Sequence, residues 1–296
     1  MDETEFKKLL LNDLGKVDEP LVTRYRLGIL THKIIRSKSG FSIKGVESQS
    51  ELAWFNGCLR SLEDTGVLIP DPDLPNSAYR ILGRPADDLE EAVCAVDSFC
   101  YLSHLSAMAH HGLTDRMPAK IFISSPSPRE WSADAEKKMK TDLGADLQLY
   151  REERMPELKR PKLTRLGGLE VHRFSSKRWG AFKKVRNGLL RVSSMGRTFL
   201  DMLRNPELCG GMRHVVGVFM EHGKTYDNLI IDEIDRNGSP IDKVRAGYIL
   251  EEKLGLGNDV IHSWSDLAQR GGSRKLDASA EFADEWSEKW CISLNL

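Results

Sequence analysis

Apolar residues recur every three or four positions in three stretches near the start of the chain, and this spacing is typical of helices that bury one face. The stretches cover residues 3–14, 21–35 and about 50–65. Ser48 or Ser50 is suited to cap the third helix, because a serine hydroxyl accepts hydrogen bonds from the free N–H groups of a first turn. Thr65-Gly66 is a usual helix end.

Two short extended segments follow, at residues 67–69 and 79–82, and a proline- and aspartate-rich loop joins them. Three helices followed by such a hairpin are the order of a winged helix-turn-helix domain. Gly83-Arg84-Pro85 then has the composition of a linker. We therefore predict two domains, at residues 1–85 and 86–296.

The rest of the chain predicts a mixed α/β arrangement that ends in helices. Helices are expected at about 87–95, 101–111 and 131–140, and strands at 120–124, 169–174 and 188–192. Beyond Ser193 the pattern is helical throughout, at about 195–203, 212–220, 226–234 and 240–253. The predicted fold class is α+β: an N-terminal winged helix-turn-helix domain, then a mixed α/β domain with a C-terminal helical bundle.

The composition excludes several classes of protein. Hydrophobic residues make up 40% and charged residues 29% of the 296 positions, which is ordinary globular usage and not that of a disordered chain. The longest apolar run, at 215–220, is far shorter than the ~20 residues that a membrane-spanning helix needs. The first residues are acidic where a signal peptide is basic, so we expect a cytoplasmic protein. The five cysteines never form a C-x-x-C pair, which argues against a disulfide framework or a cysteine zinc site.

The net charge of −1 hides an uneven distribution. Residues 22–46 are basic and contain no acid, whereas residues 227–288 carry an acidic excess. Such segregation favours a basic working face near the N-terminus. The third helix adds polar side chains of the kind that contact base edges and phosphates. The predicted DNA-binding residues are Arg24, Arg26, Lys33, Arg36, Lys38, Lys44, Gln49, Ser50, Asn56, Arg60 and Arg80.

A second basic segment runs from Arg151 to Arg191, with Trp179 and Phe182 among its cations. Interleaved aromatic and basic residues are typical of a surface that stacks bases and binds phosphates. A solvated hairpin whose lysines protect sheet edges is an equally good interpretation.

Some motifs imitate enzymes without meeting their requirements. Gly217–Thr225 has five residues between its glycines where a phosphate loop has four, and Gly223-Lys224 closes a predicted helix. His110 and His111 are adjacent on a helix and point about 100° apart, which prevents joint metal ligation. The acids at 232, 233 and 235 are more simply a solvated helix face. We therefore expect no enzymatic activity, no metal and no cofactor.

Several segments, taken in order, resemble the AbiEi family, the antitoxin components of type IV AbiE toxin–antitoxin systems. They are residues 101–113, 191–203, 210–211, 246–251, 275–277 and 290–295. The resemblance implies a winged helix that represses its own operon by binding inverted repeats. It also implies a C-terminal domain that counteracts a cognate nucleotidyltransferase-like toxin, directly or indirectly. Arg197, Asp201 and Tyr248 match the family's motif positions.

The motif allows a structural interpretation as well, because Arg197 and Asp201 are four residues apart on one predicted helix and close enough to pair. The chain departs from the family's pattern in its long N-terminal region and around residues 151–164. A transcriptional regulator whose C-terminal domain is only a sensor or oligomerisation module is the alternative. A nucleic-acid enzyme working through 151–191 would need a cluster of acids or histidines that the sequence does not supply.

Overall fold

The structure is a computed structural model that describes residues 3–37, 50–85, 88–175, 180–269 and 274–296. The chain divides into two compact units. The first contains Met1–Cys100, Ser125–Trp179 and Lys184–Arg191, and the second contains Tyr101–Ser124, Gly180–Lys183 and Val192–Leu296. The division places residues 125–179 with the N-terminal segment, whereas the sequence predicts a single boundary after residue 85.

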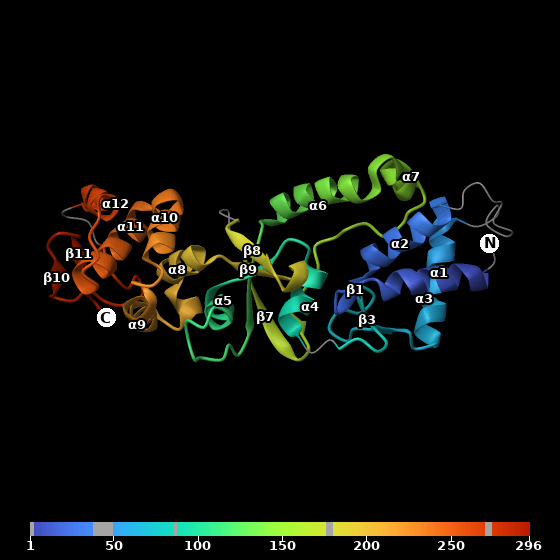
Figure 1. Cartoon of the computed structure of the whole chain (residues 1–296), viewed down its shortest axis with the longest axis horizontal. Coiled ribbons are helices and arrows are strands. Elements are labelled where there is room, and N and C mark those ends of the chain that lie inside the picture. The colour runs from blue at the N-terminus through green and yellow to red at the C-terminus, as the bar shows by residue number, and fades with distance from the viewer. Residues whose placement is uncertain (1–2, 38–49, 86–87, 176–179, 270–273) are drawn as a thin grey trace. The chain divides into compact units, whose positions relative to one another are not determined.

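The first unit opens with three helices and a small sheet (Figure 1). The elements are α1 (Glu3–Gly15), β1 (Leu21–Thr23), α2 (Arg24–Ser37), α3 (Glu51–Asp64), β2 (Leu68–Pro70) and β3 (Ala78–Ile81). The sheet is antiparallel in the order β1-β3-β2, with Leu21 opposite Arg80 and Leu68 opposite Ile81. The expectation of a helix from Leu21 is wrong for its first three residues. They form β1 because pairing with β3 satisfies their backbone groups and buries Leu21 and Val22.

The later segments of the first unit add helices and a hairpin. They are α4 (Leu89–Val96), α6 (Pro128–Leu143), α7 (Leu147–Glu152), β6 (Arg165–Leu166) and β7 (Leu169–Ser175). Helix α6 begins at a capping box in which Ser127 and Glu130 bond each other's backbone N–H groups. Strands β6 and β7 pair antiparallel around Gly167-Gly168, where both glycines have the positive φ that this tight turn requires.

The hydrophobic core of the first unit joins the N-terminal helices to α7 and the C-terminal end of α6, and α7 lies above α2 in Figure 1. Phe6, Leu27 and Phe55 share this core with Met139 and Tyr150. A Cβ at Gly28 of α2 would lie 2.5 Å from the Tyr150 hydroxyl oxygen, so only glycine permits this close approach. The core therefore draws on both sides of the predicted boundary.

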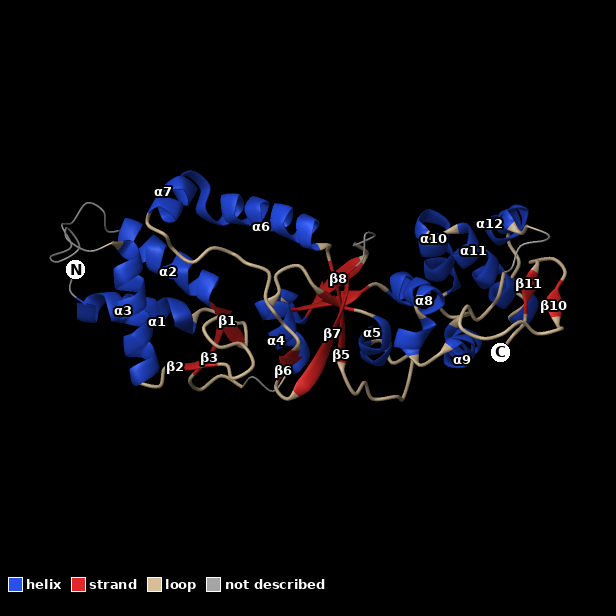
Figure 2. Ribbon diagram, turned by 180° about the vertical axis from the view of Figure 1, so that it is seen from behind, coloured by secondary structure: helices blue, strands red, loops and turns tan. Residues whose placement is uncertain are grey.

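The second unit combines short strands with a helical bundle (Figure 2). Strand β4 (Tyr101–Leu102) pairs antiparallel with β5 (Ile121–Ser125) and parallel with β9 (Leu190–Ser193). The other elements are β8 (Phe182–Val185), α5 (His104–His110), α8 (Met195–Arg204), α9 (Met212–His222), α10 (Asp227–Asn237), α11 (Pro240–Gly247), α12 (Asp259–Trp264), β10 (Trp286–Ser287) and β11 (Ile292–Ser293).

The expectation of a helix from residue 101 is wrong at its start, because Tyr101 and Leu102 are fully buried in a strand that hydrogen-bonds on both sides. A π-helical turn, Tyr248–Lys253, continues α11. The core of the bundle is formed by apolar side chains of α8 to α12, including Phe199, Phe219 and Ile234. The chain is thus of mixed α+β class, and no helix in its described part is long and apolar enough to cross a membrane.

Candidate nucleic-acid interface

Helix α2 carries a basic stripe on its exposed side. Arg26, Lys33 and Arg36 are all exposed, whereas most of the apolar residues of the helix are buried. Their spacing of seven and ten positions places them on one side of the helix. Among the described residues, no carboxylate pairs with the side chains of Arg26 and Lys33. These two charges are therefore available to an external anion.

Helix α3 presents a face of small residues. Ser50 caps it by accepting a hydrogen bond from Ala53 N. Phe55 and Leu59 are buried, while Ala53, Gly57 and Arg60 are exposed. Small side chains let another surface approach a helix closely, and Arg60 adds a positive charge.

Two of the predicted DNA-binding residues bond to each other. Arg24 Nη2 donates to Asn56 Oδ1 at 2.7 Å, and its guanidinium lies 5.1 Å from the ring centroid of Phe55. Arg80 is also engaged, because its Nε donates at 3.0 Å to Asp71, which is buried. Arg24 and Arg80 thus hold the fold in place. Lys38, Lys44 and Gln49 lie outside the described residues.

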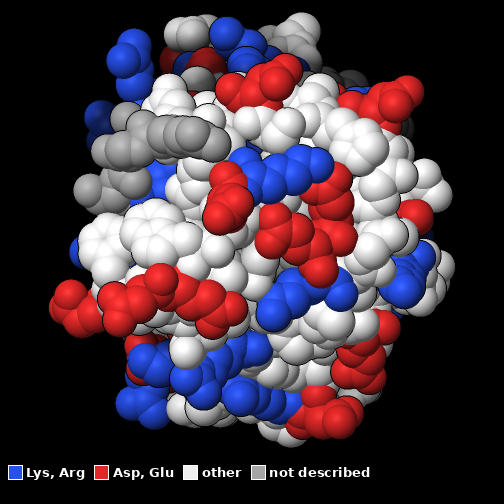
Figure 3. All heavy atoms as spheres, turned by 90° about the vertical axis from the view of Figure 1, so that its left-hand side faces the viewer, with Lys and Arg blue, Asp and Glu red and all other residues white. Residues whose placement is uncertain are grey.

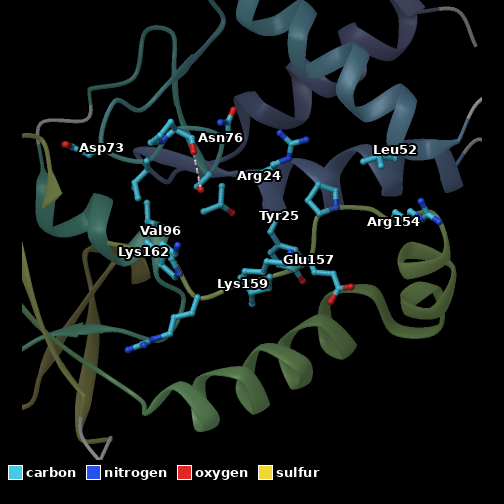
Figure 4. A pocket seen from close by; sticks show the side chains of 18 residues that line it. Arg24, Tyr25, Leu52, Asp73, Asn76, Val96, Arg154, Glu157, Lys159 and Lys162 are labelled. Carbon is cyan, nitrogen blue, oxygen red and sulfur yellow. Dashed lines mark hydrogen bonds between the residues drawn. The ribbon is translucent and has the colours of Figure 1, made fainter. Parts of the chain in front are cut away.

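The first unit contains a cavity of about 600 Å³ beside the start of α2 (Figure 4). It is lined by residues 23–25, 73–77 and 156–162, together with Leu52, Val96 and Arg154. Its cationic lining residues are Arg24, Arg154, Lys159, Arg160 and Lys162, against the acids Asp73 and Glu157. The structure therefore brings part of both predicted basic segments to one place.

Other cations of the segment 151–191 are used inside the first unit. Arg173 Nη1 donates to Asp97 Oδ2 at 2.6 Å, and Asp97 is fully buried and also accepts from Trp131 Nε1 at 2.9 Å. Arg191 donates to three backbone carbonyls around the end of α4. Arg186 pairs with Asp88 and Glu91. These contacts explain much of the segment's charge without a ligand. The predicted stacking partner Trp179 lies outside the described residues.

A buried hydrogen-bonded pair that the sequence did not reveal fixes the start of α3. His32 Nδ1 and Glu51 Oε2 are 2.6 Å apart, and His32 is almost completely buried. The other ring nitrogen, Nε2, lies 3.7 Å from Asp146 Oδ2. Glu51 N donates to Glu153 Oε2 at 2.8 Å. Because Asp146 and Glu153 lie about a hundred residues further along the chain, no local pattern could have predicted this cluster.

The antitoxin-like motif residues lie inside the second unit. Arg197 Nε donates to Asp201 Oδ1 at 2.7 Å, and both side chains are buried. Burial lowers the pKa of Arg197, but Asp201 and Tyr101 outweigh this effect and the pKa is raised overall. Burial also raises the pKa of Tyr101 to about 12. Tyr248 is buried in the helical core. The predicted i, i+4 pairing is thus present, and all three motif positions are interior.

The ATPase-like motifs lie on helices, apart from residues 223–225, which form the turn after α9. Gly217 is within α9, and Asp232 and Glu233 are within α10. Asp232 pairs with Arg236 at 2.7 Å. Burial raises the pKa of Glu233 against the opposing effect of Arg197. In the part of the chain that the structure describes, no three histidine, cysteine or acidic residues cluster in a way that would hold a metal ion.

Comparisons with known proteins give the fold alone. No model of a protein family matches the chain, and no curated protein matches it. A crystal structure of the RV2827C protein from Mycobacterium tuberculosis is similar, with a TM-score of 0.50 and 14% sequence identity. The similarity covers 97% of this chain and 90% of that chain.

Proposed function

We propose that this chain is a DNA-binding antitoxin. In this proposal the N-terminal helices and hairpin form a winged helix-turn-helix that binds inverted repeats and represses the chain's own operon. The C-terminal part counteracts a cognate nucleotidyltransferase-like toxin. The observation that carries the DNA-binding half is the exposed basic stripe of α2 beside α3.

The order of elements supports the winged-helix interpretation. A winged helix-turn-helix places a helix, a strand, two helices and a two-stranded wing in succession, which is the order of α1, β1, α2, α3, β2 and β3. The sheet order β1-β3-β2 closes the wing onto the first strand. In such a domain α3 would enter the major groove, and its exposed Ala53 and Gly57 would leave room for base edges.

Fluorescence anisotropy with a labelled duplex from upstream of the gene tests this half. The full chain should bind that duplex more tightly than a shuffled duplex of equal length. The variant with Arg26, Lys33 and Arg60 all changed to alanine should lose this preference. Lys137→Ala is the matched control, because Lys137 is an exposed cation of α6 in the same unit. Equal binding of both duplexes by the wild-type chain would refute sequence-specific recognition.

The toxin-neutralising half rests on the family resemblance and on charge. Residues 227–288 carry an acidic excess, which suits a basic protein surface better than it suits DNA. Figure 3 shows acidic and basic side chains lying among uncharged residues on one end of the second unit, so that the acids there are available to a basic partner.

Coexpression with the toxin-like reading frame next to the gene tests this half. The full chain should restore growth, and the triple alanine variant in α2 and α3 should restore it equally while failing to repress a reporter. If the triple variant loses rescue although it is expressed and folded, neutralisation depends on DNA binding and the two activities are not separate.

The cavity in the first unit favours a second candidate function. Its volume of about 600 Å³ lies within the range of small-molecule sites, and it borders both α2 and α3. A ligand there would make the chain a sensor-type transcriptional regulator without a toxin partner. Failure of the full chain to rescue growth from any neighbouring reading frame, together with intact operator binding, would favour this alternative.

A further inference from the structure

A small basic cavity lies in the second unit, within the acidic part of the chain. It has a volume of about 300 Å³ and is lined by Ile241, Arg245, Arg274, Lys275 and Ala278. Three of these five residues are cations. Neither the basic stripe of α2 nor the motif positions Arg197, Asp201 and Tyr248 include any of them, although Lys275 lies in one of the antitoxin-like segments.

The three cations are bonded to neutral oxygens. Arg245 is 7% exposed, and its Nε and Nη1 donate to the backbone carbonyls of Lys275 and Leu203 at 3.1 and 3.2 Å. Arg274 donates to Leu267 O and the side chain of Gln269, and Lys275 Nζ donates to Ala280 O at 2.6 Å. Within the described residues, no carboxylate forms an ion pair with any of these three side chains.

Burying a guanidinium without a paired anion costs free energy, so the positive charge of Arg245 favours the binding of an external anion. Asp242 and Asp277 lie near enough to favour the charged form of Arg245, but burial outweighs them and lowers its pKa. Asp242 is already bonded to Arg204 and Ser239 N, and Asp277 to Ser279. The cavity therefore offers three donors to an oxyanion, of which Arg245 is held rigidly.

An exposed aromatic pair adjoins these cations. Phe282 and Trp286 are 48% and 45% exposed, and their rings stack with centroids 6.0 Å apart and planes 11° apart. Lys275 Nζ lies 5.1 Å from the ring centroid of Phe282. A chain of direct contacts thus runs from Arg245 through Lys275 and Phe282 to Trp286.

We propose that this surface binds a nucleoside di- or triphosphate, with its phosphates at the Arg245, Arg274 and Lys275 cavity and its base against the exposed aromatic pair. Aromatic rings stack any nucleobase, and arginine binds phosphate oxygens in bidentate fashion. A single nucleotide fits better than a nucleic-acid strand, because Glu281, Asp284 and Glu285 are exposed around the aromatic residues and would repel an extended phosphate backbone.

Isothermal titration calorimetry of the full chain with GTP, ATP and CTP, and separately with inorganic phosphate, tests the proposal. The nucleotides should bind, and phosphate alone should bind more weakly. Arg274→Gln should weaken binding of both kinds of ligand by about tenfold, because it removes one charged donor. Trp286→Ala should weaken nucleotide binding by about tenfold without changing phosphate binding, and Trp286→Phe should restore it.

Two control variants keep the result specific to this surface. Arg236→Gln removes an exposed cation elsewhere in the same unit, and Lys224→Ala removes the lysine of the false phosphate loop. Neither should change the affinity. The proposal is overturned if no nucleotide binds at about 1 mM, where even weak sites fill. It is also overturned if Arg274→Gln and Trp286→Ala bind as the wild type does, if Lys224→Ala abolishes binding, or if a single-stranded oligonucleotide binds more tightly than any nucleotide.

Discussion

Arg24 donates a hydrogen bond to Asn56 at 2.7 Å, so two side chains that the sequence predicts on the DNA surface are partners of each other. The bond joins the first turn of α2 to the middle of α3, and the guanidinium also covers the ring of Phe55. Arg24 is half-buried, whereas Arg26, two residues later, is exposed. The two arginines therefore have different expected effects when they are replaced.

Replacing Arg26 and Lys33 with alanine should change DNA affinity without changing stability. Each lost phosphate contact should reduce the slope of log affinity against log salt by about 0.9. Arg24→Ala should instead lower the free energy of unfolding by about 1 to 2 kcal/mol. The change leaves Asn56 Oδ1 without its hydrogen-bond donor and removes the guanidinium that covers the ring of Phe55. Salt-dependent anisotropy and urea denaturation separate the two effects. An unchanged salt slope in the Arg26 and Lys33 variants would show that the basic stripe of α2 does not contact DNA.

The sequence predicted elements whose signals are local. Ser50, one of the two serines predicted to cap α3, does cap it, since a cap depends on residues about three positions away. It missed β1 and β4 because a strand of two or three buried residues looks like the continuation of the neighbouring helix. It also missed the packing of α6 and α7 on α2, which joins residues as distant as Tyr25 and Asp142.

The candidate site was predictable to the same extent. The charge of Arg26 and Lys33 is visible in the sequence because no acid lies near them along the chain. The sequence does not show that Arg173 pairs with Asp97 and Arg186 with Asp88, because those acids lie more than seventy residues away along the chain. A basic segment therefore overstates the charge that is free to bind a ligand.

The buried pair of His32 and Glu51 should stabilise the first unit. Glu51→Ala leaves His32 without its 2.6 Å hydrogen-bond partner in a buried site and should lower the free energy of unfolding by about 1 to 3 kcal/mol. Glu51→Gln, which keeps a side-chain oxygen, should cost less. Urea denaturation of the three proteins gives the comparison. Equal stability of Glu51→Ala and the wild type would show that the pair contributes nothing.

Tyr150 should behave as a core residue of the N-terminal helices although it lies beyond the predicted domain boundary. It is fully buried, its ring meets His32 edge-on with centroids 5.2 Å apart, and its hydroxyl donates to Pro156 O at 2.7 Å. Tyr150→Ala should cost about 3 to 5 kcal/mol, as large aromatic truncations do, and should weaken operator binding. Tyr150→Phe loses only the hydroxyl and is the matched control. Undiminished operator binding by a destabilised Tyr150→Ala protein would show that residues 1–85 work alone.

The pair of Arg197 and Asp201 should be structural. Asp201→Ala leaves a buried guanidinium without its partner at 2.7 Å, and we expect a loss of about 3 kcal/mol in the free energy of unfolding. Toxin neutralisation should fall only as far as the folded fraction falls. Growth rescue measured at two temperatures, beside circular dichroism melts, distinguishes the cases. A fully folded Asp201→Ala protein without rescue would instead place the pair in the toxin-binding surface.

The second unit should lose stability as the pH falls below about 6.5, because of His111. Burial and, to a lesser extent, the charge of Lys183 lower the pKa of His111 below its ordinary value, against the opposing effect of its 2.8 Å contact with Ser193 O. The folded chain therefore keeps this imidazole neutral at a pH where the unfolded chain binds a proton. Unfolding takes up that proton, so the stabilisation is complete above pH 6.5 and is lost progressively below it.

His111→Gln removes the titrating group while it keeps an N–H donor for Ser193 O, and the melting temperature of this variant should therefore fall less between pH 7.5 and pH 5.5 than that of the wild type. The pKa of His214 is also lowered, by burial and then by the charge of Arg116, so His214 should act in the same direction. The melting temperature of the double variant with His214→Gln should therefore depend still less on pH. Melting curves at several pH values in this window provide the measurement. Parallel pH profiles for the wild type and both variants would mean that neither imidazole takes up a proton on unfolding, and the neutral, half-buried state assigned to His111 would be wrong.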